Sequence, residues 1–403
     1  MEVASPAARL AESQVAILDG SPRRREILAH ELAAIDRAAE VIVLGQCPMV
    51  REVGLHLLAR KRQRPNLKIV LIVDPSNEAY GGTPAQYLTE LERAGVIVAR
   101  TRLNRMRDSS PLYTALWRLG IAWWSDPYDE APGEINLRST LRRLTFKADD
   151  RQLVVADDGS GGWYSIVAGA AAGEVGVELH DGLARDIAVS ELAIAAWSTQ
   201  DDRLPPAPEA KGRGLGSIDA RFLTEGAIRT ALLDAVAAAA AGDEISFAAR
   251  AMSDRPLIDA ALRAAERGAR IQILLDPETA PNRAVAGELS GARGPIEVRW
   301  FAPEQSAGQS AEHKHTALAI IRHRGELWVN LGAADFTRPS LDDFNLEAAV
   351  ELRLPARSAA ARAVLEIFSR QWSGASADAR LADDSKSAYW RYRLLQAAGL
   401  AGF

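Results

Sequence analysis

The 403-residue sequence contains a single cysteine, Cys47, so no disulfide can form within the chain. It has no run of roughly 20 apolar residues, the length that a membrane-spanning helix needs. The N-terminal residues also lack the unbroken apolar core of a signal peptide. Positive charge is not in excess, because 48 Lys and Arg face 53 Asp and Glu. These absences predict a cytoplasmic, soluble protein with no global attraction to nucleic acid or to an anionic membrane, and they leave room for a local basic patch.

Apolar residues make up 48% of the chain, enough for a sizeable core in two domains or in one two-lobed unit. Their pattern occurs twice, about 200 residues apart: helix, strand, helix, basic residue, strand, then Asp-Pro. In the first half we expect helices over 22–39 and 50–62 and strands over 41–44 and 68–73, followed by Asp74 and Pro75. In the second half we expect helices over 225–241 and 256–267 and strands over 244–247 and 270–275, followed by Asp276 and Pro277.

Such internal similarity predicts a duplicated α/β unit, and the strand–helix–strand connections favour a sheet rich in parallel strands. A stretch rich in Pro, Gly and charged residues separates the copies. We therefore expect an N-terminal lobe over 1–200, a linker over 201–217 and a C-terminal lobe over 218–403.

The most specific stretch of the chain is 312–352. It opens with His313, Lys314 and His315, continues into a buried strand at 317–321, and reaches a small-residue turn that starts at Gly332. A further strand is expected over 346–352. This order of strands predicts that His315, Asp335, Asn345 and Glu347 lie near one edge of a sheet.

Residues 312–352 resemble the second catalytic half of the phospholipase D superfamily. Residues 107–113 and the C-terminal segment 389–403 also look like segments of its bacterial, cardiolipin-synthase-like branch. That family carries His-x-Lys-x4-Asp, a strand, then Gly-Ser-x-Asn and a downstream acidic residue. The resemblance implies a duplicated phospholipase-D-type α/β/α sandwich of two pseudo-twofold-related lobes. It also implies an active site on the pseudo-twofold axis, with one motif from each lobe.

The first motif falls in 146–157, which looks like the family's Lys-Ala-Asn-His-Arg-Lys-x4-Asp. Here Asp149 replaces Asn, Asp150 replaces His and Gln152 replaces Lys, whereas Asp157 is retained. The second motif aligns in two ways, on His313 or on His315, and both alignments leave the lysine position without a lysine. The His315 alignment keeps the strand at 317–321 in step with the family's apolar run.

In active family members one His attacks phosphorus, the other protonates the leaving group, and the two Lys neutralise charge on the pentacoordinate phosphorus. Losing one transition-state donor costs on the order of 100- to 1000-fold in rate. Because both lysines and one histidine are missing from their places, the resemblance implies loss of double-displacement chemistry on phosphodiesters.

The replacements also reverse the charge of the site. If Asp149, Asp150, Asp157, Asp335 and Glu347 converge with the histidines, the cleft repels phosphate and favours a cation or a basic substrate. It could also run acid–base chemistry between Asp150 and His315, because close titratable groups split their pKa values. The spacing matches no usual metal-ligand pattern, so we expect neither a metal nor a cofactor. The alternative is that these acids are solvated remnants of an inactive site.

The sequence thus favours a repurposed or inactive phospholipase-D-like protein with an acidic and His-containing cleft between its lobes. Two alternatives stay open: an enzyme with altered acid–base chemistry on another substrate, and a residual phosphodiesterase or phosphatidyltransferase that uses His315. The candidate catalytic residues are His315, Glu347, Asp150 and Asp157. The candidate binding residues are His313, Lys314, Gln152, Asp335, Arg338 and Asn345.

We expect the ligand to be a small molecule or a lipid head group and not nucleic acid. The apolar run at 112–124 carries aromatics at one end and is typical of a core helix. Its alternative is a segment that contacts a membrane surface or a lipid tail. The basic side chains at 138–147 precede the first motif and are the local source of cations beside it.

Overall fold

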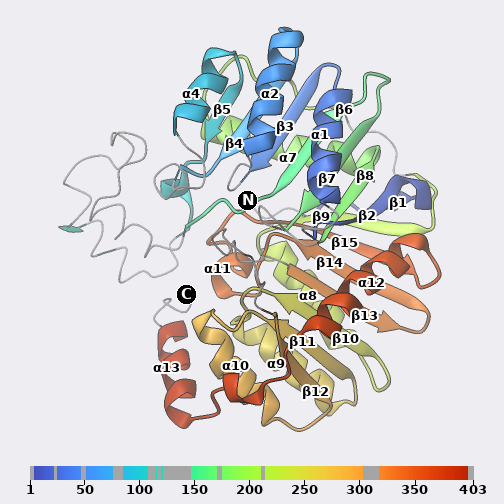
Figure 1. Ribbon diagram of the computed structural model, residues 1–403, viewed down its shortest axis with the longest axis vertical. Helices are drawn as coiled ribbons and strands as arrows, with labels where there is room; N and C mark the ends of the chain where they lie inside the picture. The colour runs from blue at the N-terminus through green and yellow to red at the C-terminus, as the bar shows by residue number, and fades with distance from the viewer. Residues whose placement is uncertain are drawn as a thin grey trace.

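The computed structural model describes residues 4–21, 25–46, 51–75, 85–107, 147–169, 175–209, 214–302 and 317–397, together with 115, 119 and 120. The chain forms two lobes, each built around one sheet (Figure 1). His313, Lys314, His315, the run at 112–124 and the basic side chains before Lys147 lie outside the described residues.

The first sheet has the order β2-β8-β7-β6-β3-β4-β5. In chain order its strands are β2 (Val15–Asp19), β3 (Val41–Gln46), β4 (Lys68–Val73), β5 (Ile97–Arg100), β6 (Leu153–Asp157), β7 (Trp163–Ala168) and β8 (Val175–His180). The helices of this lobe are α1 (Glu26–Arg37), α2 (Arg51–Gln63), α4 (Ala85–Arg93) and α7 (Gly182–Ser198), with short 3-10 turns at Glu12–Gln14 and Leu103–Arg105.

The second sheet has the order β1-β9-β15-β14-β13-β10-β11-β12. Its strands are β1 (Ala8–Leu10), β9 (Ile218–Thr224), β10 (Glu244–Ala249), β11 (Arg270–Leu275), β12 (Ile296–Trp300), β13 (Ala317–His323), β14 (Glu326–Gly332) and β15 (Ala348–Pro355). Its helices are α8 (Gly226–Ala238), α9 (Arg255–Glu266), α10 (Ala280–Ser290), α11 (Arg338–Leu341), α12 (Ala359–Gly374) and α13 (Lys386–Ala397), with a 3-10 turn at Ala379–Leu381.

The seven strands of the first sheet and the strands from β9 to β12 of the second sheet have the same topology, which confirms the duplicated α/β fold, and β1 is an addition to the second sheet. In each, three successive strands pair in parallel, β3-β4-β5 and β10-β11-β12. The remaining pairs are antiparallel, so the sheets are mixed and less rich in parallel pairs than expected. The carboxyl ends of the parallel strands form one edge of each sheet, where α/β proteins place their functional groups.

Local sequence explains why these elements form where the periodicity predicts them. The parallel strands β3 and β4 are dominated by Val, Ile and Leu and are buried on both faces, as a covered parallel sheet requires. Helix α9 begins at an Asp254 cap, whose carboxylate accepts a hydrogen bond from the Leu257 amide, and Pro256 occupies its first turn.

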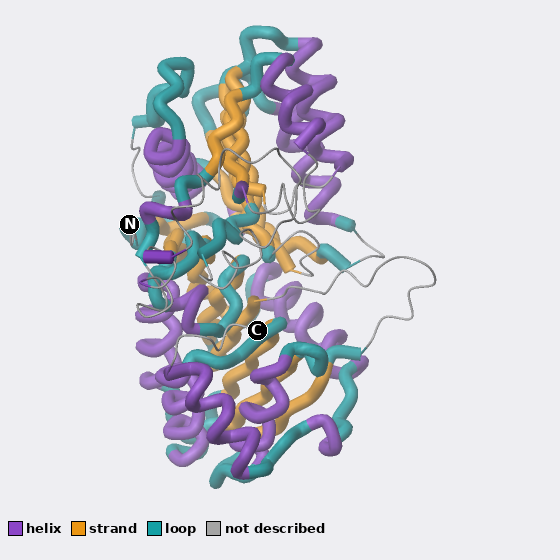
Figure 2. The backbone as a smooth tube through the Cα atoms, turned by 90° about the vertical axis from the view of Figure 1, so that its left-hand side faces the viewer, coloured by secondary structure: helices purple, strands orange, loops and turns teal. Residues whose placement is uncertain are grey.

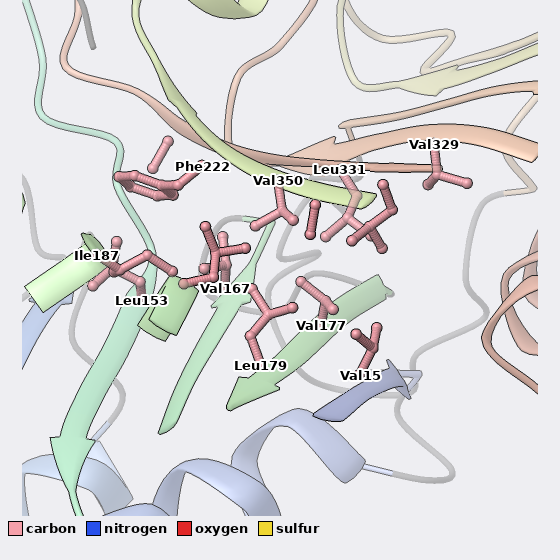
Figure 3. Packing of buried hydrophobic residues seen from close by; sticks show 14 of the residues in the cluster. Val15, Leu153, Val167, Val177, Leu179, Ile187, Phe222, Val329, Leu331 and Val350 are labelled. Carbon is pink, nitrogen blue, oxygen red and sulfur yellow. The ribbon is translucent and has the colours of Figure 1, made fainter. Parts of the chain in front are cut away.

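The hydrophobic core lies in three layers. One cluster packs α1, α2 and α4 on the outer face of the first sheet, and a second packs α8, α9 and α10 on the outer face of the second. The third fills the space between the sheets with Val and Leu side chains from β6, β7, β8, β14 and β15 (Figure 3). The side view shows the strands stacked through the length of the molecule with helices on either side (Figure 2).

The chain crosses between the lobes at more than one place. Strand β1 lies early in the sequence but pairs antiparallel with β9, so the first residues complete the second sheet. Residues 199–209 and 214–217 contain no helix or strand, which fits their expected role as a connection; the domain limits themselves stay a prediction. Among the described residues no helix is both long and apolar enough to cross a membrane.

Candidate functional site

The two motif segments lie against each other where the lobes meet. Asp149 and Leu346 form a parallel β-bridge. The Asp150 amide donates to the Leu346 carbonyl (3.0 Å), and the Leu346 amide donates to the Ala148 carbonyl (2.9 Å). The Asn345 carboxamide adds to this pairing, because its Oδ1 accepts from the Ala148 amide at 3.2 Å. The structure therefore brings residues almost 200 positions apart into one site, as the duplication implies.

A tight turn at the end of β14 places the second-lobe side chains. A Cβ on Gly332 would lie 2.2 Å from the Ala348 carbonyl oxygen, so only glycine allows β14 to approach β15 this closely. The chain then passes Asp335 and enters α11, whose first turn is capped by the Thr337 hydroxyl. The predicted edge of the sheet is thus real for Asp335, Asn345 and Glu347.

Asp150, which the sequence analysis aligned with the family's first histidine, lies in an acidic environment. Asn345 Nδ2 is 3.4 Å from its carboxylate. Burial and the neighbouring carboxylates of Asp74, Asp149 and Asp335 raise the pKa of Asp150 to about 7, against the opposing pull of Arg250. Its carboxyl is thus poised to gain or lose a proton near neutral pH.

Glu347 is fully buried, with 0% exposure. Burial and the nearby Asp150 raise its pKa well above the usual value, although Ser340 and Asn345 favour the charged form. Among the described residues neither carboxyl oxygen has a partner in normal hydrogen-bond geometry. Its surroundings therefore disfavour the charged form of the Glu347 carboxyl.

Asp149 is held by groups from the ends of neighbouring strands. Thr101, which follows β5, donates its hydroxyl to the Asp149 carboxylate at 2.6 Å. The Asp149 amide donates to the Asp74 carboxylate at 2.8 Å. Burial raises the pKa of Asp149, against Arg151 and Thr101. Asp149 is therefore buried and hydrogen-bonded within the fold.

Arg151 forms a buried ionic network that joins the lobes. Its guanidinium lies 2.7 Å from Glu191 on α7 and 3.4 Å from Glu225 at the start of α8, and its side chain is 1% exposed. Burial lowers the pKa of Arg151, but the surrounding carboxylates outweigh it and raise the pKa overall. Burial raises the pKa of Glu225 to about 7 despite Arg151.

Arg250 supplies a cation on the second-lobe side. It follows β10, and its Nε lies 3.0 Å from Asp335 Oδ2. Asp335 Oδ1 also accepts from the Ala251 amide, which holds the loop after β10 against the turn after β14. Burial lowers the pKa of Arg250, but the carboxylates of Asp335, Asp150 and Asp276 raise it overall. The positive charge of Arg250 is therefore balanced by these carboxylates.

The remaining predicted site residues lie in different parts of the two lobes. Asp157 lies at the far end of β6, where its carboxylate accepts from the amides of Glu40, Val41 and Gly159, so it is not brought to the other acids. Gln152 is buried at the start of β6. Arg338 lies over the Phe344 ring at 5.4 Å and 3.5 Å from Asp342.

Four residues of the site fall outside the motif pattern: Asp74, Glu191, Glu225 and Arg250. Asp74 had a usable signal, since its Asp-Pro pair ends a parallel strand and recurs as Asp276 and Pro277. Glu191 and Glu225 had none, because an acid within a helix or just before one is common. Among the described residues no group of three or more His, Cys, Asp and Glu is arranged to hold a metal ion.

The histidines inside the described ranges make local pairs away from this site. His30 and His180 both contact Glu178, whose pKa falls to about 2, chiefly through its hydrogen bond with His180. His56 pairs with Asp36, and His323 with Asp243. These four histidines therefore pair with acids outside the interlobe site.

Comparison with known proteins shows which class of protein this chain is similar to. Residues 235–372 match the family model described as "Cardiolipin synthase, PLD-like domain". The fold is similar to that of phosphatidylserine synthase from Haemophilus influenzae Rd KW20, with 9% identity, a TM-score of 0.59 and coverage of 98% of this chain and 96% of that one. It is also similar to polyphosphate kinase from Porphyromonas gingivalis, with 13% identity, a TM-score of 0.50 and coverage of 96% and 53%.

These similarities identify a two-lobed phospholipase D fold. The family match covers residues 235–372 in the second lobe, and the similarity in fold extends over both lobes. No curated protein sequence matches it.

Proposed function

We propose that this protein is a phospholipase-D-type scaffold that has lost phosphodiester chemistry and binds a small cationic or basic ligand between its lobes. The proposal rests on the position and the surroundings of Asp150. This residue takes the place of the family's first histidine and is surrounded by Asp74, Asp149 and Asp335. A carboxylate there cannot form the phosphohistidine that the family's chemistry needs, and it repels the phosphate that the ancestral site attracted.

Charge supports a basic ligand more than a phosphate. Arg250 and Arg151, the arginines that lie among these acids, already pair with carboxylates. Asp150 and Glu347 can together lose a proton when a cation arrives, which would offset the charge of the ligand at little electrostatic cost. An ammonium or guanidinium group is the chemistry that best matches this arrangement.

A thermal-shift experiment tests the proposal, because a ligand that binds the folded state raises the melting temperature by mass action. The probes are ethanolamine, 1,4-diaminobutane and arginine methyl ester as cations, and inorganic phosphate and glycerophosphate as anions. We expect the cations to stabilise the wild type at pH 8 and to have little effect on Asp150→Asn. The exposed Asp219→Asn is the matched control and keeps the response.

Turnover provides the opposing test. We expect no hydrolysis of bis(p-nitrophenyl) phosphate above the rate in buffer and no acid-labile phosphohistidine after rapid quenching. A trapped phosphohistidine would mean that His313 or His315 still attacks phosphorus, and it would overturn the proposal in favour of residual phosphodiesterase or phosphatidyltransferase activity.

The coupled carboxyls support a second candidate, an enzyme with acid–base chemistry on a substrate without a phosphodiester. The pKa of Asp150 is raised to about 7, and the pKa of the neighbouring Glu347 is raised as well, and raised pKa values of this kind are used in general acid–base catalysis. In this case His315→Ala abolishes turnover and leaves the melting temperature almost unchanged. Activity that survives this substitution rules out the role of His315.

A further inference from the structure

Helix α13 has a buried face and an exposed apolar face. Ala388 and Tyr392 point inward, and the Tyr392 hydroxyl donates to the Ser253 carbonyl at 2.7 Å. On the other side Trp390 is 62% exposed and Leu394 is 67% exposed. Because these two residues are four positions apart, they lie one above the other on the outer face of the helix.

Cations surround this apolar pair. Lys386 and Arg391 are exposed, and the helical spacing puts them on the same face as Trp390 and Leu394. Arg393 lies at the edge of this face, with its guanidinium 5.8 Å from the centre of the Tyr389 ring. The described helix contains no Asp or Glu, so three positive charges face no acid within it. We call Lys386, Trp390, Arg391, Arg393 and Leu394 the α13 face.

This face differs from the other exposed apolar residues. Leu55, Leu119, Val189 and Leu215 are also exposed, but they lie far from one another in the sequence. In the α13 face an indole, a leucine and basic side chains occur within nine residues. Trp with Leu on one helical face and Lys or Arg beside them is the composition of helices that lie in a membrane interface.

Helix α13 is connected to the edge of the second sheet that carries the candidate site. Tyr392 bonds to Ser253, and the Ser253 amide donates to the Phe336 carbonyl at 2.8 Å. Phe336 directly follows Asp335. In Figure 1 both α13 and α11 lie on the left-hand side of the molecule. The α13 face is thus attached to the same edge as the acids, though it does not form part of their cluster.

We propose that the α13 face docks the protein on the surface of an anionic lipid bilayer. The cations match anionic head groups, and the indole of Trp390 suits the boundary between head groups and acyl chains. The whole chain has a formal net charge of −5, so attraction has to be local to this helix and would fix the orientation of docking. Asp383 and Asp384 precede the helix, and Asp383 is engaged by the Ser385 amide. The proposal stands independently of the ligand proposed for the interlobe site.

Co-sedimentation with vesicles tests this surface. The probes are vesicles of phosphatidylglycerol mixed with phosphatidylcholine and vesicles of phosphatidylcholine alone. We expect the wild type to sediment with the anionic vesicles at low salt and to be released at high salt, because surface charge is screened. The double variant Trp390→Ala/Leu394→Ala should weaken the partition coefficient by about tenfold or more.

Three further variants separate docking from a folding defect. Leu55→Ala/Leu215→Ala removes two exposed apolar side chains elsewhere and should bind as the wild type does. Lys386→Glu/Arg391→Glu should lose binding to anionic vesicles, and Trp390→Phe should retain most of it. Circular dichroism melts check that each variant is folded.

Two outcomes would overturn the proposal. The first is that the wild type ignores anionic vesicles, or binds them as well as Trp390→Ala/Leu394→Ala does. The second is that light scattering shows a dimer that this double variant abolishes, since the α13 face would then be covered by a second copy of the chain.

Discussion

At the scale of the residue, Asp150 connects the sequence change to a measurable property. Its carboxyl has an ordinary pKa of 3.8 in the unfolded chain and about 7 in the fold, because burial and three neighbouring acids disfavour its charge. Below pH 4 it is protonated in both states and has no effect on stability. Between pH 4 and 7 the folded state retains a proton that the unfolded state releases, so stability falls as the pH rises.

Asp150→Asn should therefore stabilise the protein at high pH. We expect its free energy of unfolding to exceed that of the wild type by about 1–3 kcal/mol at pH 8, and the difference to vanish below pH 4. Urea unfolding at a series of pH values measures this. A gain that is the same at pH 4 and pH 8 would show that Asp150 does not carry a raised pKa.

Arg151 is the residue whose loss should be most damaging. Replacing it with Met leaves Glu191 and Glu225 without their cation in a buried position, and breaking such a pair costs about 3–5 kcal/mol. Urea unfolding should show this loss, and Arg151→Met/Glu191→Gln/Glu225→Gln should recover part of it. Arg9→Ala, which removes one side of an exposed ion pair, is the control and should change stability little. An equally small change in Arg151→Met would contradict the network.

At the scale of the element, the starts of α7 and α8 allow a matched comparison. Asp181 and Glu225 both precede a helix-starting glycine and both have positive φ, 61° and 48°. Non-glycine residues are strained there by about 1–3 kcal/mol. Asp181→Gly removes strain from an exposed residue, whereas Glu225→Gly removes strain together with a partner of Arg151.

We expect Asp181→Gly to leave the free energy of unfolding unchanged or to raise it by about 1 kcal/mol. Glu225→Gly should lower it, because the buried Arg151 loses an acid. Thermal and urea unfolding of the two variants provide the test. If both stabilise the protein, the Arg151–Glu225 contact is not important for stability.

The same scale shows what the sequence could predict. The elements around the parallel strands follow from periodic apolar residues and from the Asp-Pro pairs after the strands. The predicted strands over 41–44, 68–73, 244–247 and 270–275 overlap β3, β4, β10 and β11. Added antiparallel strands such as β1 could not be predicted from the sequence, because a strand of three residues shows no periodic pattern and its partner strand lies over 200 positions away. For the site, motif letters located Asp150, Asn345 and Glu347, but the Arg151 network depends on long-range packing that no local pattern encodes.

At the scale of the whole molecule, the lobes are joined by strand exchange and by ion pairs. Strand β1 pairs with β9, Ser5 exchanges hydrogen bonds with Phe222, and Arg370 on α12 contacts Asp19 of β2. The central core uses side chains from both sheets. We infer that the lobes fold as one cooperative unit.

Deleting residues 1–11 tests this unity. It uncovers the edge of β9 and removes the buried Ala8 and Leu10, so we expect a loss of roughly 2–4 kcal/mol and a tendency to associate through the open edge. Urea unfolding and light scattering measure the two effects. Unchanged stability and a monomeric state would show that β1 contributes nothing to the second sheet.

Calorimetric titration tests most directly whether the interlobe site binds a cation instead of phosphate. The wild type and Asp150→Asn are titrated with 1,4-diaminobutane and with inorganic phosphate, at pH 7 in two buffers of different ionisation enthalpy. We predict that the wild type binds the diamine with a heat that depends on the buffer, because Asp150 and Glu347 release a proton. We predict no such binding in Asp150→Asn. Phosphate should give no heat of binding to either protein. Tight phosphate binding by the wild type without binding of the diamine would contradict the account and would mean that the interlobe site still serves phosphate chemistry.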